Sequence, residues 1–193
     1  MAQKRLAIFA SGSGSNAEKI AEYFTDHADI EVTLILSNNP QAGVIARARR
    51  LHIPVVLFDR KTFYETNKII DILQNEHIDL VVLAGFMMLI PEAMVHAFPN
   101  RIINIHPALL PKYGGKGMYG HFVHEAVVEA RELESGISIH YVNEHYDEGD
   151  IIFQATCPVT PEDTPEEVAR KVQVLEHQHY PEVVEKLLSA LNS

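Results

Sequence analysis

The chain has 193 residues, of which 47% are hydrophobic and 22% are charged, as is ordinary for a globular protein with one buried core. Its formal net charge is −10, which argues against nucleic-acid or anionic-membrane binding through the overall field. The single cysteine, Cys157, excludes an internal disulfide and a multi-cysteine metal site. No stretch approaches the roughly 20 apolar residues of a membrane span. We therefore expect a cytoplasmic protein that acts on small molecules.

In chain order, short apolar runs alternate with amphipathic segments. Strands are predicted at 5–10, 31–37, 54–59, 79–85 and 101–105, and helices at 16–27, 41–52 and 61–76. Continuous Val, Ile and Leu runs that alternate with helices are typical of a parallel sheet covered on both faces.

The second half of the chain has a different pattern. A Gly-rich loop at 114–120 precedes a helix at 121–131, and strands at 136–142 and 150–159 flank a short polar segment that suits a hairpin. A last helix at 164–191 has Asp163 or Thr164 as its cap and Pro165 in its first turn. The predicted fold class is α/β: a single domain with a Rossmann-like, mostly parallel twisted sheet, helices on both faces and an antiparallel C-terminal edge.

The segment ASGSGSN joins the first strand to the first helix, with glycines at 12 and 14. Free backbone amides at a helix start bind phosphate, and glycine allows the anion to approach. The spacing resembles a dinucleotide fingerprint, but the acidic residue expected after the second strand is missing, since LILSNNP offers only Ser37, Asn38 and Asn39. The turn therefore predicts a phosphate site for a mononucleotide-like ligand, with a simple tight turn as the alternative.

The run RIINIHPALLP places Asn104 and His106 two residues apart at the end of a strand, so both side chains project to the same side. The carboxyl end of a strand in an open α/β sheet is where ligands usually bind. An amide can stabilise a developing oxyanion and an imidazole can handle a proton, a combination that suits acyl transfer. A carboxylate would orient the histidine. Asp147 is one candidate, and spacing alone leaves Glu148 and Asp150 open.

The sequence offers no covalent nucleophile, because it lacks a G-x-S-x-G elbow and Cys157 lies in an apolar strand beside a proline. Metal ligation is also weakly supported. His121 with His124, and His177 with His179, have no convincing carboxylate partner. Direct transfer without a metal is the simpler hypothesis.

Six segments follow one another in an order known from one family: ASGSGSN, LAGFMMLIP, INIHPALLPKY, GISIHYV, YDEGDIIFQ and LEHQHYP. Over essentially its whole length the chain resembles the phosphoribosylglycinamide formyltransferases of the folate-dependent formyltransferase family. The resemblance implies the formyltransferase fold for 1–193, with 1–100 as the phosphate-binding mononucleotide half and 101–193 as the catalytic and folate-binding half. It implies direct transfer of the formyl group of 10-formyltetrahydrofolate, the co-substrate, to the amine of 5'-phosphoribosylglycinamide in de novo purine biosynthesis.

The resemblance also implies roles for individual residues. Asn104 would polarise the formyl oxygen of the bound folate, His106 would support the tetrahedral intermediate, and Asp147 would orient His106 and assist proton movement. The substrate phosphate and ribose would be held by Gly14, Ser15, Asn16 and Glu176. The pterin pocket would be lined by the backbone of Met87, Met88, Leu89 and Ile90, with 143–149 folding over it.

Two departures from the family pattern concern the folate side. Relatives often have a basic residue where this chain has Met88, and the loop 112–126 is longer than usual, so neither His121 nor His124 is assigned a role. For the folate tail we expect a cation at Lys61, in preference to Arg60. The expected state is a monomer or weak homodimer. The alternative functions are hydrolysis of 10-formyltetrahydrofolate and a non-catalytic folate- or nucleotide-binding homologue, against which the intact Asn104, His106 and Asp147 argue.

Overall fold

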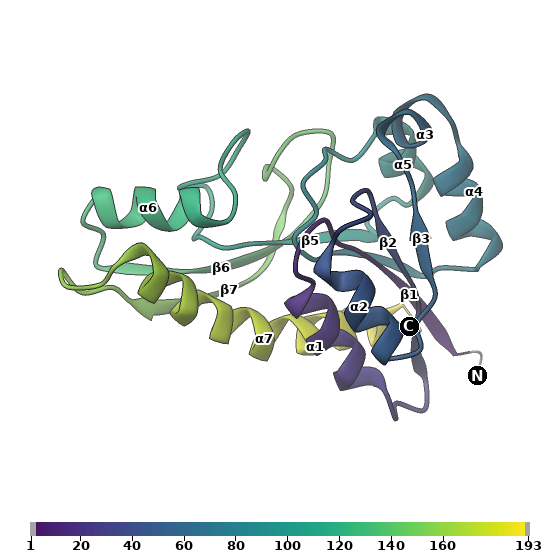
Figure 1. Ribbon diagram of the computed structural model, residues 1–193, viewed down its shortest axis with the longest axis horizontal. Coiled ribbons are helices and arrows are strands. Elements are labelled where there is room, and N and C mark those ends of the chain that lie inside the picture. Colours follow the sequence, from purple (N-terminus) through teal and green to yellow (C-terminus); the bar gives the residue numbers. More distant parts are fainter. Residues whose placement is uncertain (1–2, 192–193) are drawn as a thin grey trace.

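The computed structural model describes residues 3–191, and its centre is one seven-stranded sheet in the order β3-β2-β1-β4-β5-β6-β7 (Figure 1). The first five strands pair in parallel: β1 (Lys4–Phe9), β2 (Ile30–Ser37), β3 (Val55–Leu57), β4 (Leu80–Leu83) and β5 (Ile102–His106). The antiparallel strands are β6 (Glu134–Tyr141) and β7 (Ile151–Pro158). The predicted mostly parallel sheet with an antiparallel C-terminal edge is confirmed.

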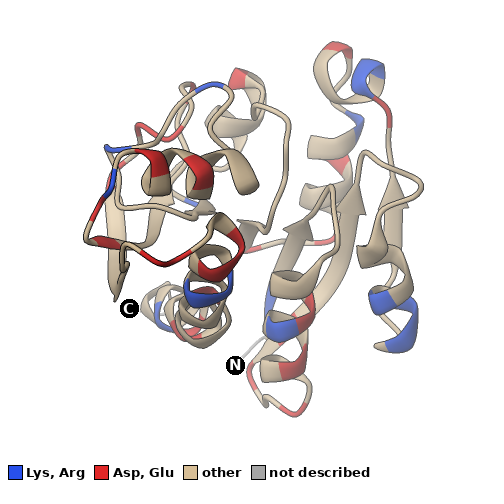
Figure 2. Ribbon diagram, turned by 60° about the vertical axis from the view of Figure 1, so that its left-hand side comes forward, with Lys and Arg blue, Asp and Glu red and all other residues tan. Residues whose placement is uncertain are grey.

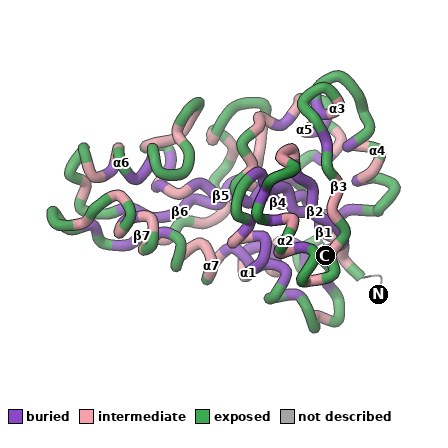
Figure 3. The backbone as a smooth tube through the Cα atoms, in the orientation of Figure 1, coloured by how far each residue is buried: buried purple, intermediate pink, exposed green. Residues whose placement is uncertain are grey.

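The helices cover both faces of the sheet and enclose two apolar clusters. The first cluster contains side chains of α1 (Ser15–Phe24), α2 (Gly43–Arg50), α6 (His121–Glu129) and α7 (Pro165–Ala190). The second contains side chains of α3 (Arg60–Glu65), α4 (Lys68–Asn75) and α5 (Glu92–Ala97). Because apolar burial drives this packing, the central strands are the most deeply buried part of the chain (Figure 3), and the charged residues lie mainly on the surrounding helices and loops (Figure 2).

The predicted helix at 61–76 is wrong in one respect, because the structure has two helices there. Asp59 accepts a hydrogen bond from the backbone N–H of Thr62 and so caps α3, and Thr66 then adopts extended backbone angles that end the helix. The helix α5 was not predicted at all, since six residues are too few to establish a helical period. Of the two predicted cap candidates, Asp163 and Thr164, Thr164 caps α7. It forms a capping box with Glu167.

The order of the strands reverses between β1 and β4, and this is the point where open α/β sheets bind ligands, beyond the carboxyl ends of the strands. Ser11 joins the loops that follow these two strands. Its N–H donates to the carbonyl of Gly85 at 3.0 Å, and its hydroxyl accepts from the N–H of Met87 at 3.0 Å. Within 3–191, no helix is long and apolar enough to cross a membrane.

Candidate active site

A cavity of about 400 Å³ lies at the carboxyl ends of β4 and β5. Its wall combines the loop after β4, the end of β5, part of β6, the loop between β6 and β7, and one side of α7. The predicted catalytic residues Asn104, His106 and Asp147 all line it, as do Met87, Met88, Leu89, Ile90 and Glu176. Segments far apart in the sequence thus meet at one site.

The first polar pair in the cavity joins β5 to β6. Asn104 is the direct partner of His140 in the antiparallel register, and its Nδ2 lies 3.1 Å from Nε2 of His140. The other ring nitrogen of His140 lies 2.9 Å from the carbonyl of Tyr141. Since a carbonyl can only accept, Nδ1 of His140 carries the proton and Nε2 accepts from Asn104. His140 therefore fixes the orientation of the Asn104 amide.

His106 is buried, and each of its ring nitrogens has a different partner. Nε2 lies 2.7 Å from the backbone carbonyl of Tyr113 and must donate a proton to it. Nδ1 lies 3.6 Å from Oδ2 of Asp147. Burial lowers the pKa of His106, while the charge of Asp147 and the Tyr113 carbonyl oppose that shift only in part. Nδ1 is therefore the nitrogen at which His106 can gain or lose a proton.

Asp147 faces both histidines from the loop between β6 and β7. Its Oδ2 accepts a hydrogen bond from the N–H of Gly115 at 2.9 Å, and its Oδ1 lies 3.6 Å from Nε2 of His140. Burial alone would raise its pKa, but the neighbouring imidazoles of His140 and His106 and the Gly115 N–H together hold the pKa of this carboxyl below its usual value. Of the three acidic residues that spacing left open, Asp147 is the one that contacts His106.

The turn after β1 lies beside the cavity and is linked to it through Glu176. Asn16 donates from Nδ2 to Oε2 of Glu176 at 3.0 Å, and burial raises the pKa of Glu176 although this hydrogen bond opposes the shift. Gly14 has φ +77, and a Cβ there would lie 2.5 Å from the side chain of Val44, so this position requires glycine. The cavity wall includes Glu176 but not residues 14–16.

A basic residue that sequence reasoning missed lies at the same turn. Nε of Arg47 donates to the carbonyl of Ser13 at 2.8 Å, and its guanidinium pairs with Glu18. Because it extends from α2, no motif in the sequence links it to the turn. Arg47 therefore places a guanidinium, paired with Glu18, beside the segment predicted to hold phosphate.

The side of the cavity formed by the loop after β4 is apolar, and Met87 in this loop is half-exposed. Lys61 is exposed on α3 and does not line the cavity. Its neighbour Arg60 lies 4.8 Å from the ring centre of Tyr64, whose hydroxyl donates to the carbonyl of Leu89 at 2.9 Å. The role of Lys61 stays a prediction, and Arg60 is the residue of this pair that is linked to the cavity wall.

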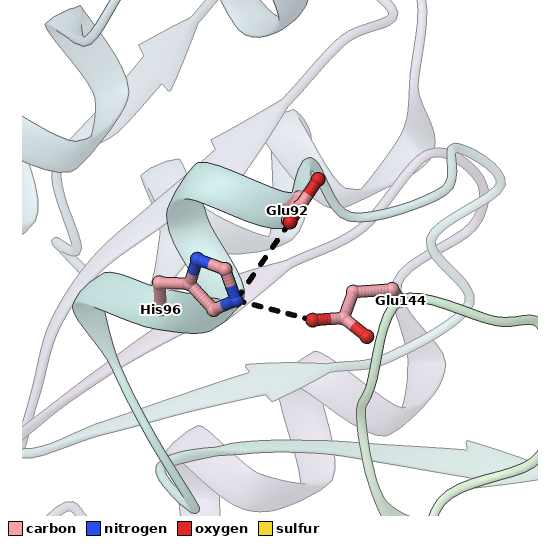
Figure 4. Close-up of side chains that lie close together, drawn as sticks. All are labelled: Glu92, His96 and Glu144. Atoms are coloured by element: carbon pink, nitrogen blue, oxygen red, sulfur yellow. Dashed lines mark hydrogen bonds and ion pairs between the residues drawn. The ribbon is translucent and has the colours of Figure 1, made fainter.

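An exposed cluster connects α5 to the loop that carries Asp147. Nε2 of His96 lies 3.2 Å from Glu144 and 3.9 Å from Glu92 (Figure 4). The three side chains could offer ligand atoms to a metal ion, since these atoms lie within 4.8 Å of one another. All three are exposed, and the hydrogen bond between His96 and Glu144 accounts for the position of the loop side chain. We interpret the cluster as a tether for the loop.

The two histidines that the sequence left unassigned lie in different surroundings. Both line the cavity, but His121 is exposed at the start of α6, whereas His124 is buried. Burial, followed by the nearby charges of His106 and His121, lowers the pKa of His124 to about 4. Its Nδ1 is buried and has no hydrogen-bond partner among the described residues.

Sequence reasoning also missed His140. The available signal was the alternation of Ser138 and His140 in a strand that was otherwise apolar, but the register that sets His140 opposite Asn104 is not readable from one sequence. The contacts made by the Tyr113 carbonyl and the Gly115 N–H are backbone contacts, for which residue type gives no signal.

An amide donor, a buried imidazole and an ionised carboxylate at the carboxyl edge of a parallel sheet define the site of a group-transfer enzyme. The model of the formyl transferase family matches residues 4–184, and the chain belongs to that family.

Proteins similar to this chain include two phosphoribosylglycinamide formyltransferases. The chloroplastic protein of Arabidopsis thaliana is 45% identical over 188 residues, which cover 94% of this chain and 64% of the relative. The chain thus spans about 64% of the length of that relative. The protein of Bacillus subtilis (strain 168) is 37% identical over 194 residues, which cover 98% of this chain and 97% of the relative.

Solved structures agree with this assignment. The phosphoribosylglycinamide formyltransferase of Bacillus halodurans has a TM-score of 0.86 at 40% identity, with 96% of each chain covered. The enzyme of Anaplasma phagocytophilum has a TM-score of 0.88 at 34% identity, with 97% of this chain and 88% of the other covered. Similarity at this level extends over the whole sheet and its helices.

Proposed function

We propose that the protein transfers the formyl group of 10-formyltetrahydrofolate to the amine of 5'-phosphoribosylglycinamide, a step of de novo purine biosynthesis. The observation that carries this proposal is the convergence of Asn104, His106 and Asp147 in one cavity. Relatives named phosphoribosylglycinamide formyltransferase, at 37% and 45% identity, support formyl transfer and the choice of the amine substrate.

The amine substrate would bind at the β1 turn. Its phosphate would lie against Gly14, Ser15 and Asn16 at the start of α1, where free backbone amides favour an anion. Arg47 would add charge from α2. Glu176 would accept hydrogen bonds from the ribose hydroxyls, since it lines the cavity next to Asn16. This placement directs the primary amine toward Asn104 and His106.

The formylfolate would occupy the apolar side of the cavity. Backbone groups of Met87, Met88, Leu89 and Ile90 would bind the pterin ring, and the loop that carries Asp147 would cover it. Tyr146 belongs to the same wall. For the folate tail we keep Lys61 as the proposed cation, with Arg60 as its alternative.

In the reaction the amine nitrogen attacks the formyl carbon, and the carbonyl oxygen becomes an oxyanion. Asn104 donates to that oxygen from Nδ2, which His140 holds in place. The attack leaves the amine nitrogen as an ammonium, and Asp147 accepts the proton that this ammonium loses, directly or through water, while His106 shares the proton at Nδ1. N10 of the folate gains a proton as its bond to carbon breaks. One proton leaves the amine and one reaches N10, so the transfer balances without a covalent enzyme intermediate.

A cytoplasmic location and a monomeric or weakly dimeric state are part of the proposal. Plant relatives are named chloroplastic, so the location is tested by fractionation of the native cells. The oligomeric state is tested by sedimentation of the purified protein.

The activity is tested by supplying the purified protein with both substrates and measuring tetrahydrofolate and formate. We expect tetrahydrofolate to form only when 5'-phosphoribosylglycinamide is present, with one formylated product for each folate consumed. Formate release without the amine would favour the hydrolase, and binding of both ligands without turnover would favour the non-catalytic homologue.

A further inference from the structure

The segment 112–115 contacts both members of the His106–Asp147 pair. The carbonyl of Tyr113 accepts the hydrogen bond from Nε2 of His106 at 2.7 Å. Two residues further on, the N–H of Gly115 donates to Oδ2 of Asp147 at 2.9 Å. One short piece of backbone therefore orients the imidazole and the carboxylate together.

This backbone is in a conformation that needs external support. Tyr113 has φ +55 and Gly115 has φ +96, and a left-handed conformation costs a residue such as Tyr about 1 kcal/mol or more. The loop that follows is rich in glycine, with Gly114, Gly115 and Gly117, so it contributes little rigidity of its own. Side-chain contacts must hold the carbonyl of Tyr113 against His106.

Glu132 provides those contacts from the turn between α6 and β6. Its carboxylate accepts from the hydroxyl of Tyr113 at 2.9 Å and from Nζ of Lys112 at 3.0 and 3.2 Å. The Lys112 side chain is 66% exposed, so this ion pair contributes little by itself. The hydrogen bond from the Tyr113 hydroxyl to Glu132 is the contact that holds the segment, because the carbonyl of the same residue binds His106.

We propose that Glu132 is a positioning residue that, through Tyr113, keeps the single proton of the neutral His106 ring on Nε2. The partner of one imidazole nitrogen determines which nitrogen carries the proton. With Nε2 held as a donor to Tyr113, Nδ1 is left to exchange its proton with Asp147. Loss of the Glu132 contact frees the carbonyl, and neutral His106 then places its proton on either nitrogen.

A consequence for acidity follows from the same contact. The Tyr113 carbonyl favours the charged imidazolium and so raises the pKa of His106 against the effect of burial. A loosened carbonyl lowers that pKa further. The catalytic part of this inference rests on the proposed function, whereas the protonation state of His106 can be observed without turnover.

The test uses the full chain with Glu132→Ala and Tyr113→Phe, and with Glu129→Gln as a control on the exposed face of α6. Long-range ¹⁵N–¹H spectra report the proton on each ring nitrogen of His106, and steady-state kinetics report kcat and KM. Tyr113→Phe keeps the backbone carbonyl and the ring, so it tests the contact even where Glu132→Ala does not fold.

We expect both variants to show mixed His106 tautomers and a lower His106 pKa, with kcat reduced about tenfold and KM within twofold for both substrates. The double variant should lose no more than the larger single loss, because both changes act through one contact. Wild-type His106 spectra in Tyr113→Phe would overturn the inference, whatever the kinetics. If the spectra change and the wild type itself has no transferase activity, the proposed function fails while the positioning role stands.

Discussion

Nδ1 of His106 lies 3.6 Å from Oδ2 of Asp147, and both side chains are almost fully enclosed by the protein. The distance is longer than a hydrogen bond, because Nε2 of the ring is occupied by the Tyr113 carbonyl and Nδ1 of a neutral ring has no proton to offer. A proton that arrives from the substrate can bind between the two groups. The pair is therefore suited to receive a proton during the reaction and to return it afterwards.

Replacement of His140 by Phe should disorder the Asn104 amide. The ring is kept, but the acceptor for Nδ2 of Asn104 is lost. We expect kcat to fall about 10- to 100-fold, which is about 1.4 to 2.7 kcal/mol, because a weakened oxyanion donor costs less than the roughly 3 to 4 kcal/mol of a donor that is removed. His140→Gln should recover part of the activity, because its side-chain oxygen can accept from Asn104. Steady-state kinetics check both values.

The control for this variant is His77→Asn. His77 is exposed and has φ +51, a conformation that Asn tolerates, so this change should leave kcat within twofold. Equal kcat in wild type and His140→Phe would contradict the role given to His140.

Replacement of Glu176 by Gln should weaken the binding of the phosphoribosyl substrate and leave folate binding unchanged. The amide can still bond to Asn16, but it loses the charge that favours hydrogen bonds from two ribose hydroxyls. We expect KM for 5'-phosphoribosylglycinamide to rise about tenfold or more, with KM for the folate unchanged. Glu166→Gln, on the exposed start of the same helix, is the matched control. A larger effect on the folate than on the amine substrate would reverse the proposed orientation of the two ligands.

His124 should make stability depend on pH below neutrality. Burial lowers its folded-state pKa to about 4, whereas the unfolded value is near 6.5. Between these values the unfolded chain binds more protons, so the free energy of unfolding falls as pH drops from about 6.5 to 4. The contribution of His124 to the free energy of unfolding should fall by on the order of 2 kcal/mol across this window.

Urea unfolding from pH 4.5 to 7.5 measures this contribution. In His124→Leu we expect a flatter curve over the same window, because the titrating imidazole is removed. The variant should still fold, since Nδ1 of His124 has no hydrogen-bond partner in the described structure to lose. An unchanged slope would show that other groups, such as His106, dominate the pH dependence.

Much of the fold was predictable from the alternation of apolar runs with amphipathic segments, because each run buried in a parallel sheet is short and continuous. The shared direction of Asn104 and His106 followed from the two-residue period of a strand. The break at Thr66 and the helix α5 were not predictable, since local caps and tertiary packing decided them.

The arrangement of the site was less predictable from the sequence than the fold. Asp147 could not be separated from Glu148 and Asp150 by spacing, and only the resemblance favoured it. Its position against His106 depends on a loop closed by the β6–β7 hairpin and on a backbone φ of +56 at Asp147 itself. Contacts made by backbone atoms, as from Tyr113 and Gly115, leave no trace in residue type.

The most direct test of the site is single-turnover formyl transfer by Asp147→Asn with both substrates saturating. Asn matches the size of Asp and tolerates its left-handed backbone, so the change removes charge and basicity with little effect on shape. We predict that the transfer rate falls by about 10²- to 10⁴-fold while the affinity for each substrate stays within about tenfold. A transfer rate within twofold of the wild-type rate would contradict the account.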